Sequence, residues 1–509
     1  MSFLKAFGTV SSITLISRIL GLLRDIVSAY FFGASLLYDS FLTAFTAPNL
    51  LRNLFGEGAL NAAVVPVFAE QQKDPEESKK FVASLLGWVI LTVGAIVIIA
   101  VATSLILITG FSLPPKWQLV LDMFWRMFPF AIFICLVAAY GALLNVKERF
   151  SAPSLAPALF NALWIGALLI FGFGLHFDTN KVAFILCYAV LFSGFVQLLL
   201  QILSARKVGI SQTISFKRHP CVARVQVLML PMLFGLALFQ VNALADRLIV
   251  YTFVPKGGGV TALFYSNRLV QFPLALIGIA AATALFPSAA KAVKEGKPDK
   301  LYALVRRSVR TIILLAFPAT VALILLRYNI IKVLFQRGRF DEDAVTRTAN
   351  TLLFYSIGLV FFCLAHIATR LLYARERIKP VVIITGICTV LNLIMNLVLV
   401  FPLAESGVAL STSISSALNF SLLVLVAEKE ERASIIKGFK ALIPATCGCA
   451  AMVAAILLVE SAYYGLLIKL IFAVLAGGVA YSLPIVLLKT EELQRIIGKH
   501  KKTKEDEEE

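Results

Sequence analysis

The sequence predicts an all-α polytopic membrane protein, and three of its properties support this fold class. Of its 509 residues, 59% are hydrophobic and only 15% are charged, and the mean hydropathy is +0.88. A soluble chain of this length could not cover so much apolar surface with polar side chains. Apolar runs of about 20 residues, the length that crosses the hydrocarbon core, recur along the chain. We therefore expect about 14 transmembrane helices.

The expected helices follow the apolar runs in order. The first run follows a single lysine, Lys5, and has no small-residue cleavage site, so we expect it to remain in the mature chain. The second run is longer than one crossing requires, and we expect it to kink at Pro48 and at Gly56–Gly58 before a short following piece. The expected ranges are 8–32, 36–69, 81–109, 119–146, 153–174, 182–203, 225–253, 259–288, 308–327, 347–374, 380–402, 406–427, 440–460 and 464–488.

The loops between these runs alternate in charge. Every second loop is rich in lysine and arginine, whereas the others carry isolated lysines such as Lys116, Lys181 and Lys256. By the positive-inside rule the basic loops are cytoplasmic, and an even number of helices places both termini on that side. The net charge of +18 then needs no nucleic-acid partner. One loop on the other side, residues 329–340, is basic and amphipathic, and we expect it to form an interfacial helix on the outer leaflet.

Residues typical of metal or redox sites do not cluster. The seven cysteines are scattered and the four histidines lie far apart. The closest cysteines, Cys447 and Cys449, are separated by one residue, which fits neither the usual zinc spacing nor an ordinary redox pair. The acidic run Asp341–Asp343 would lie on the side away from cytoplasmic sugar-nucleotide donors. We therefore predict that the protein is not an enzyme and has no resident cofactor.

Two halves of the chain resemble each other. The segment Leu143–Phe150 matches Leu371–Ile378, 228 positions later, and a proline follows each. Asp25 and Asp246 are 221 positions apart, as are Pro66 and Pro287. This repeat predicts two six-helix lobes related by a pseudo-two-fold axis along the membrane normal, with two extra C-terminal helices. The predicted parts are an N-lobe (1–203), a basic cytoplasmic linker (204–224), a C-lobe (225–427), the last two helices (428–488) and a charged cytoplasmic tail (489–509).

The first apolar run carries charges that a membrane helix normally excludes. It contains Ser17, Arg18, Arg24 and Asp25. A lipid-facing arginine near the bilayer centre costs about 2.5–3.5 kcal/mol on the insertion scale, so these side chains should face a cavity or be neutralised. Helical spacing places Ser17 and Arg24 on one face. Arg18 and Asp25 share a neighbouring face and can pair, which would leave Arg24 without a local partner.

Further charges in other apolar runs suggest an anionic substrate. Asn49 and Arg52 form a polar strip after Pro48, and Arg268 lies in the eighth run. The planar guanidinium donates two parallel hydrogen bonds to a phosphate or carboxylate and stays protonated, so arginines from both halves can clamp a pyrophosphate. The alternative is that nearby carboxylates neutralise each arginine, with Arg52 next to Glu57 as one example. The candidate pairs of this kind are Arg18–Asp25, Arg247–Asp246 and Arg52–Glu57.

Two further polar groups have open roles. Asp39 is either a coupling-ion or proton site or a partner for an arginine. A candidate sodium site could draw oxygen atoms from helices of the second half. Hydrogen bonding between helices by asparagine is an equally good explanation of these residues. The candidate sodium ligands are Asp246, Asn392, Asn396, Val408 and Thr412.

At these residues the chain resembles the MurJ (MviN) lipid II flippases of the multidrug/oligosaccharidyl-lipid/polysaccharide (MOP) exporter superfamily. The resemblance implies transport of lipid II, the undecaprenyl-pyrophosphate-linked peptidoglycan precursor, from the cytoplasmic to the outer leaflet by alternating access. This step serves cell-wall organisation and cell shape. Alternatives are a flippase for another lipid-linked oligosaccharide or a MATE-like antiporter. The matching segments are Ser17–Arg18, Leu22–Asp25, Phe32–Ala34, Asp39–Phe41, Ala47–Arg52, Glu57–Ala59, Val65–Phe68, Asn267–Pro273 and Leu285–Ser288.

The resemblance also assigns roles to residues and partners. It implies a bacterial cytoplasmic (inner) membrane location, lipid II and membrane lipids as ligands, and a lipid-tail groove formed with the last two helices. Nothing in the sequence requires more than a monomer, and we expect cell-wall synthesis machinery as a protein partner. Membrane potential or a sodium ion would drive transport. Asn267 departs from relatives with aspartate there, and Asn396 takes a position that can be aspartate, which weakens the sodium site. The resemblance implies that Arg18, Arg24, Arg52 and Arg268 are essential cavity residues that bind the substrate and that Asp39 is the essential aspartate. We add Ser17 and Asn49 as expected substrate-binding residues, and Asp25 and Glu57 as expected transport-essential or coupling residues.

Overall fold

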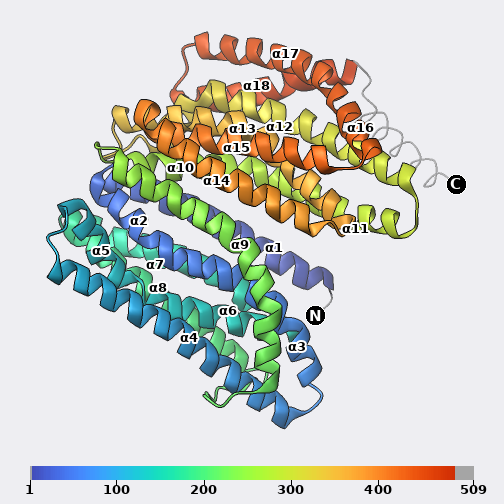
Figure 1. Ribbon diagram of the computed structural model, residues 1–509. Helices are drawn as coiled ribbons and strands as arrows, with labels where there is room; N and C mark the ends of the chain where they lie inside the picture. Colours follow the sequence, from blue (N-terminus) through green and yellow to red (C-terminus); the bar gives the residue numbers. More distant parts are fainter. Residues whose placement is uncertain (1–2, 488–509) are drawn as a thin grey trace. The chain divides into compact units, whose positions relative to one another are not determined.

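The computed structural model describes residues 3–487, and every regular element in this part of the chain is a helix (Figure 1). Apart from a few end residues and the break between α5 and α6, each expected range coincides with helical structure. Among the described residues, 10 helices are long and apolar enough to cross a membrane, or 11 if the bent pair α5–α6 is one span. The all-α membrane fold is confirmed, and the count of 14 crossings stays a prediction.

The helices form two compact units. Unit 1 consists of Met1–Thr261 and Arg337–Asp341, and unit 2 consists of Ala262–Gln336 and Glu342–Glu509. The helices of unit 1 are α1 (Phe3–Phe32), α2 (Leu36–Leu51), η1 (Arg52–Ala59), α3 (Leu60–Gln71), α4 (Pro75–Gly110), α5 (Pro115–Met127), α6 (Phe130–Val146), α7 (Ser151–Ala167), η2 (Leu168–Gly174), α8 (Thr179–Arg206) and α9 (Pro220–Phe253). Helix α10 (Gly259–Pro273) begins at the end of unit 1 and continues into unit 2.

Unit 2 contains most of α10 and the remaining helices. They are η3 (Leu274–Ile279), α11 (Ala280–Lys294), α12 (Pro298–Phe335), α13 (Glu342–Ala374), α14 (Ile378–Leu403), α15 (Glu405–Val426), α16 (Lys429–Gly438), η4 (Phe439–Ala441), α17 (Leu442–Ser461) and α18 (Leu466–Leu487). The short surface helix α16 was not expected from the sequence. The charged tail predicted for 489–509 and Lys5 with its neighbouring side chains lie outside the described residues.

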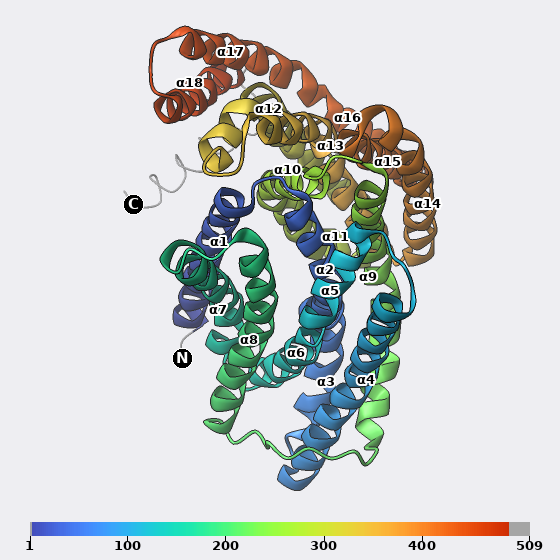
Figure 2. The same ribbon diagram turned by 90° about the vertical axis from the view of Figure 1, so that its left-hand side faces the viewer.

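Helix α9 packs in unit 1, against α2, η1, α3 and α4 (Figure 2). Near its start, Arg224 donates to both carboxylate oxygens of Glu70 at 2.5 and 3.1 Å. Further along, Asn53 of η1 donates to Gln240 at 3.2 Å. The internal repeat assigns this helix to the C-lobe. The repeat and the packing of α9 therefore point to different parts of the protein. The predicted lobe boundaries stay a prediction.

The internal repeat has a structural counterpart in two helix ends. Glu148 and Glu376, which are 228 positions apart, both adopt left-handed backbone conformations with φ of 55° and 57°. In each case the next N–H donates to the carbonyl five residues earlier at 2.9 Å. This is the helix-terminating turn that glycine usually makes. The same uncommon geometry at matched positions supports the repeat.

A second matched feature is a stretch of π-helix in each half. The π-helix η1 follows α2, and the π-helix η3 follows α10. Leu274, the first residue of η3, lies 221 positions after Asn53 of η1. The helix does not end at Pro48, because α2 continues through this proline and changes form at Arg52. The expected kink at Pro48 stays a prediction. A wider helical turn absorbs the irregular sequence without ending the helix.

The expected interfacial helix over 329–340 is wrong. Residues 329–335 continue α12, whose Ile331 and Phe335 are 0% and 1% exposed. The turn that follows belongs to unit 1, where Arg339 donates its N–H to the carbonyl of Tyr30 at 2.9 Å. An amphipathic pattern is the same for a helix on a bilayer and for one packed on protein. The sequence pattern therefore could not separate the two.

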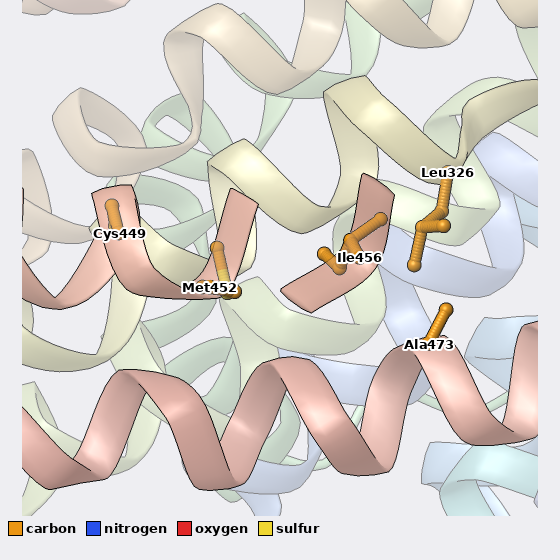
Figure 3. Close-up of a cluster of buried hydrophobic side chains, with 5 residues drawn as sticks. All are labelled: Leu326, Cys449, Met452, Ile456 and Ala473. Carbon is orange, nitrogen blue, oxygen red and sulfur yellow. The ribbon is translucent and has the colours of Figure 1, made fainter. Parts of the chain in front are cut away.

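The last two helices are joined to α12 by an apolar cluster. The cluster consists of Leu326 of α12, Cys449, Met452 and Ile456 of α17 and Ala473 of α18, all 5% exposed or less (Figure 3). Polar contacts flank the cluster. The Tyr481 hydroxyl donates to the Leu314 carbonyl at 2.6 Å, and Asn329 donates to Glu460 at the same distance. This hairpin is therefore an integral part of unit 2.

A prediction concerns two glycines of α4. The segment before α9 lies along α4, and Ser215 donates its N–H to the Ala83 carbonyl at 2.9 Å. A Cβ atom on Gly87 would lie 2.8 Å from the Ser215 carbonyl carbon, whereas one on Gly94 would have nothing within 4 Å. We expect Gly87→Ala to lower stability by about 1–3 kcal/mol through this overlap. Gly94→Ala, the control, should be neutral or stabilising by up to about 1 kcal/mol. Thermal unfolding in detergent measures both, and equal behaviour would contradict the close contact.

A second prediction concerns the ion pair between Arg224 and Glu70 at the start of α9. The hydrogen bond from Arg224 lowers the pKa of Glu70 from its ordinary value. A carboxylate with a lowered folded-state pKa stabilises above its unfolded-state pKa, and this stabilisation is lost as pH falls through the folded-state value. We expect Glu70→Gln to lower the melting temperature slightly at neutral pH, and the difference from wild type should vanish as the pH falls through the lowered pKa of Glu70. Glu430→Gln is the control, because Glu430 is exposed and forms no ion pair in the described part of the chain. A difference that persists in acid would contradict the ion pair.

Candidate functional site

Arg24 is buried where α1 packs against α7. Its Nε and Nη2 atoms donate to Oδ1 of Asp25 at 3.0 and 2.6 Å, and its guanidinium lies 4.9 Å from the ring centroid of Trp164. Arg24 is 9% exposed and Asp25 is 1% exposed. The indole Nε1 of Trp164 donates to the Ser28 hydroxyl at 3.0 Å. An opposite charge and an aromatic face thus compensate the buried cation.

This arrangement corrects the expected pairing. The prediction that Arg18 pairs with Asp25 and leaves Arg24 without a local partner is wrong. Arg18 is exposed, and Asp25 pairs with Arg24. Asp25 is buried together with Arg24 on the side of α1 that packs on α7, and a buried carboxylate needs its counter-charge in the same region. Ser17 lies on this side too, because its carbonyl accepts from Asn161 of α7 at 3.1 Å.

Arg52 lies among amide side chains at the start of η1. Its Nε donates to Oδ1 of Asn49 at 3.0 Å, and its Nη2 donates to Oδ1 of Asn53 at 3.2 Å. The structure therefore brings together the predicted strip of Asn49 and Arg52. The side chain of Glu57, the expected carboxylate partner, lies outside the described residues. The two amide oxygens thus hold the guanidinium in place.

Asp39 caps the start of α10. Its carboxylate is 3% exposed. Oδ2 accepts from the N–H groups of Gly258 and Val260 at 2.7 and 3.3 Å, and Oδ1 accepts from the N–H and hydroxyl of Thr261 at 2.8 and 2.6 Å. The first N–H groups of a helix lack intrahelical partners and carry partial positive charge. Asp39 therefore uses a helix end as its counter-charge, so the alternative of an arginine partner is wrong, and the coupling role stays a prediction.

Two glycines allow this approach of backbone to backbone. Gly258 has φ of +99°, and a Cβ atom on it would lie 2.6 Å from the Ala34 carbonyl oxygen. A Cβ atom on Gly257 would lie 2.6 Å from the Leu36 nitrogen. The turn before α10 therefore fits against the turn before α2 only without side chains. The run of three glycines at 257–259 is the sequence signal that could have identified this contact.

A short hydrogen-bonded chain lies next to Asp39. The hydroxyls of Ser40 and Tyr251 are 2.8 Å apart, and Tyr251 donates to the Lys116 carbonyl at 2.6 Å. The Lys116 ammonium donates to the Thr252 carbonyl at 2.8 Å. A cation near the last carbonyls of a helix is favourable, so Lys116 fixes the end of α9. Sequence reasoning noted Lys116 only as an isolated lysine and missed Tyr251.

The predicted site residues in the second half of the chain are divided between the two units. Arg268 is exposed on the unit 2 part of α10, and its neighbour Asn267 accepts from Gln271 at 2.6 Å. Asp246 is buried in unit 1, where Arg247 donates to the Thr46 hydroxyl at 2.5 Å.

The other four candidate sodium ligands lie in unit 2. Asn396 donates to Asn392 at 3.1 Å, and the Thr412 hydroxyl donates to the Val408 carbonyl at 3.0 Å. Each of these bonds stays within one helix. They support neither a sodium site nor the alternative of bonds between helices, and the sodium site stays a prediction.

Comparison with known proteins decides the family. The family model described as "Lipid II flippase MurJ" matches residues 28–482. The chain belongs to the MurJ family. The lipid II flippase MurJ of Burkholderia cenocepacia is 35% identical over 439 residues, which cover 84% of each chain. The probable lipid II flippase MurJ of Buchnera aphidicola subsp. Acyrthosiphon pisum is 33% identical over 431 residues and 83% of each chain.

Solved structures agree on the fold. A lipid II flippase MurJ in an inward closed conformation has a TM-score of 0.76 at 24% identity, covering 95% of this chain and 99% of that chain. An inward-facing MATE-family transporter of the MOP superfamily has a TM-score of 0.67 at 16% identity, covering 85% and 98%. The chain therefore has the MurJ fold within the wider MOP architecture.

A prediction follows from the cap on α10. In Asp39→Asn one acceptor oxygen becomes an NH2 donor that faces backbone N–H groups. Because bonds to a charged acceptor contribute about 1.5–3 kcal/mol, we expect the amides of residues 258–261 to exchange hydrogen about 10- to 100-fold faster. Hydrogen-exchange mass spectrometry measures this. Ser40→Ala is the control, since it removes the bond to Tyr251 and leaves the cap in place. Unchanged exchange in Asp39→Asn would contradict the capping role.

Proposed function

We propose that this protein is a lipid II flippase, which moves the undecaprenyl-pyrophosphate-linked peptidoglycan precursor from the cytoplasmic to the outer leaflet. Membership of the MurJ family over most of the chain supports this substrate. The observation that carries the proposal physically is the buried Arg24 on α1, the helix that the sequence predicts to be the first membrane crossing. Such a charge is costly in a bilayer and is typical of a transported anion's path. MurJ proteins are transporters, so no chemical step on the substrate is needed.

Four arginines bind the diphosphate in this proposal. They are Arg18, Arg24, Arg52 and Arg268, with Ser17 and Asn49 as polar neighbours. A guanidinium donates two parallel hydrogen bonds to phosphate oxygens and cannot lose its proton in the protein. Asp25 and Glu57 act as counter-charges when the substrate is absent. The exposed Arg18 meets the ligand first, and the buried Arg24 holds it more strongly because less water competes there.

Asp39 acts as a conformational latch in the same proposal. Alternating access requires contacts that form in one state and break in another. The bonds between Asp39 of α2 and the residues at the start of α10 link these two helices next to the turns 33–35 and 254–258. Charge-assisted hydrogen bonds of this kind are strong enough to favour one of the two conformations of the transport cycle. Because there are few of them, they can break together when the protein changes to the other conformation.

The finer features of the transport cycle are also proposals. Both termini lie in the cytoplasm of a bacterial cell and the protein sits in its inner membrane as a monomer, with cell-wall synthesis machinery as its neighbour. A membrane potential that is negative inside assists outward movement of an anion by about 2.3 kcal/mol per charge per 100 mV. A sodium ion at the second-half asparagines would add to this drive.

The test replaces the proposed cations in cells that depend on this protein. We expect Arg24→Ala, Arg52→Ala and Arg268→Ala to abolish the appearance of lipid II in the outer leaflet. The protein level in the membrane should remain unchanged. Arg24→Lys keeps a counter-charge for Asp25 but loses the planar fork, and we expect it to transport poorly while folding normally.

Arg307→Ala, at an exposed cytoplasmic position, is the control for these variants. Outer-leaflet lipid II is measured with an externally added, membrane-impermeant enzyme that cleaves it. Full transport by the three alanine variants would contradict the binding role. Undiminished outer-leaflet lipid II after depletion of the wild-type protein would contradict the function itself.

A further inference from the structure

The Arg24 guanidinium lies against an aromatic cluster, 4.9 Å from the ring centroid of Trp164 and 5.9 Å from that of Phe160. Trp164 of α7 contacts Phe41 edge-on at 5.2 Å between ring centroids, Phe45 at 5.8 Å and Phe160 at 5.6 Å. Phe130 of α6 completes the cluster at 6.0 Å from Phe160. All five rings belong to unit 1 and come from α2, α6 and α7. Such a network of ring contacts leaves little freedom for the position of the indole.

The indole is also fixed by its polar edge. Its Nε1 atom donates to the Ser28 hydroxyl at 3.0 Å, and both residues are buried, with Ser28 at 0% and Trp164 at 3% exposure. Ser28 lies one helical turn after Arg24 on α1. The hydrogen bond therefore ties the ring to the helix that carries the guanidinium. In this position the ring face lies 4.9 Å from the Arg24 guanidinium carbon.

The contact between Arg24 and Asp25 has a particular geometry. Both guanidinium donors, Nε and Nη2, point to the same oxygen, Oδ1. Arginine binds carboxylate and phosphate groups most strongly when two donors meet two oxygens in a fork. A diphosphate that offers two oxygens can therefore replace Asp25 with a gain in hydrogen-bond geometry. The exchange requires that the guanidinium keep its place while its anion changes.

We propose that Trp164 is a positioning residue for the diphosphate-binding arginine. Its ring face holds the Arg24 guanidinium while Asp25 gives way to the diphosphate of the lipid substrate. This inference rests on the proposed function. Tryptophan has the most electron-rich face of the aromatic side chains, so it binds a cation better than phenylalanine does. Its indole N–H supplies the bond to Ser28 that no other hydrophobic residue could make.

The test separates attraction by the ring face from simple packing. Mono-, di- and trifluorotryptophan are placed site-specifically at position 164 in the full-length protein in lipid nanodiscs. Fluorine withdraws electron density from the ring face and changes the ring size little. We expect the dissociation constant of purified lipid II to rise with each fluorine, about ten-fold in total, which corresponds to about 1.4 kcal/mol. Undecaprenyl diphosphate should show the same trend, because it carries the same diphosphate.

Two matched controls accompany the series. In the Arg24→Gln, Asp25→Asn background the pair has similar size and no charge, and the trend should be flat. The same series at Trp125 should leave binding unchanged. Trp125 also lies under an arginine, with the Arg126 guanidinium 4.4 Å from its ring, but it is on α5.

Each outcome is decisive. A stepwise rise at position 164 that disappears in the neutral background supports the proposal. Equal binding across the series at position 164, with lipid II still bound by the wild type, overturns it and leaves the proposed function intact. Failure of the wild type to bind lipid II overturns both. Ser28→Ala adds an independent arm, because it frees the indole N–H without altering the ring, and unchanged binding there would contradict the role of the hydrogen bond.

Discussion

The ion pair between Arg24 and Asp25 is the constraint on which the side-chain packing around α1 and α7 depends. Neither charge could be buried alone, because a single buried ion costs several kcal/mol even after relaxation. The pair is therefore enclosed by α7, and the Trp164 ring covers the guanidinium. The rings of α2 and α6 then pack on Trp164. Aromatic side chains of three other helices thus pack next to one pair of charges on the first helix.

Asp39 is a second buried carboxylate, and its charge is balanced in a different way. This carboxylate is 3% exposed, and no arginine of the described part of the chain pairs with it. Three backbone N–H groups at the start of α10, which carry the partial charge of a helix end, and the Thr261 hydroxyl balance it instead. A helix end moves whenever its helix moves, whereas Asp25 and Arg24 travel together on one helix. A hydrogen bond between a carboxylate and the end of another helix, as at Asp39, therefore changes when that helix moves and can control the movement. An ion pair within one helix, as between Arg24 and Asp25, keeps its geometry and is suited to hold a ligand.

Hydropathy and periodicity were sufficient to predict where the helices and their unusual charges lie. The expected ranges and the strip of Asn49 and Arg52 follow from single-helix patterns, which the chain expresses locally. The partner of Asp25 could not be predicted in this way, because the choice between Arg18 and Arg24 depends on which face of α1 meets α7. The same limit explains Asp39, whose donors lie more than 200 residues away, and α12, whose amphipathic end packs on protein instead of lipid.

Comparison of the two halves of the internal repeat indicates which charged residues the shared backbone needs. At the 221-residue offset Asp25 corresponds to Asp246, but Arg24 corresponds to Ala245 and Arg52 to Pro273. Helix α9 folds with its buried aspartate and no arginine before it, and its own arginine follows instead and donates to Thr46. The shared backbone, including the π-helices and the left-handed glutamates, therefore does not depend on a cation at the position of Arg24. The backbone that the two halves share thus leaves Arg24 available for another role, and a buried guanidinium on an aromatic face has the chemistry to bind an anion.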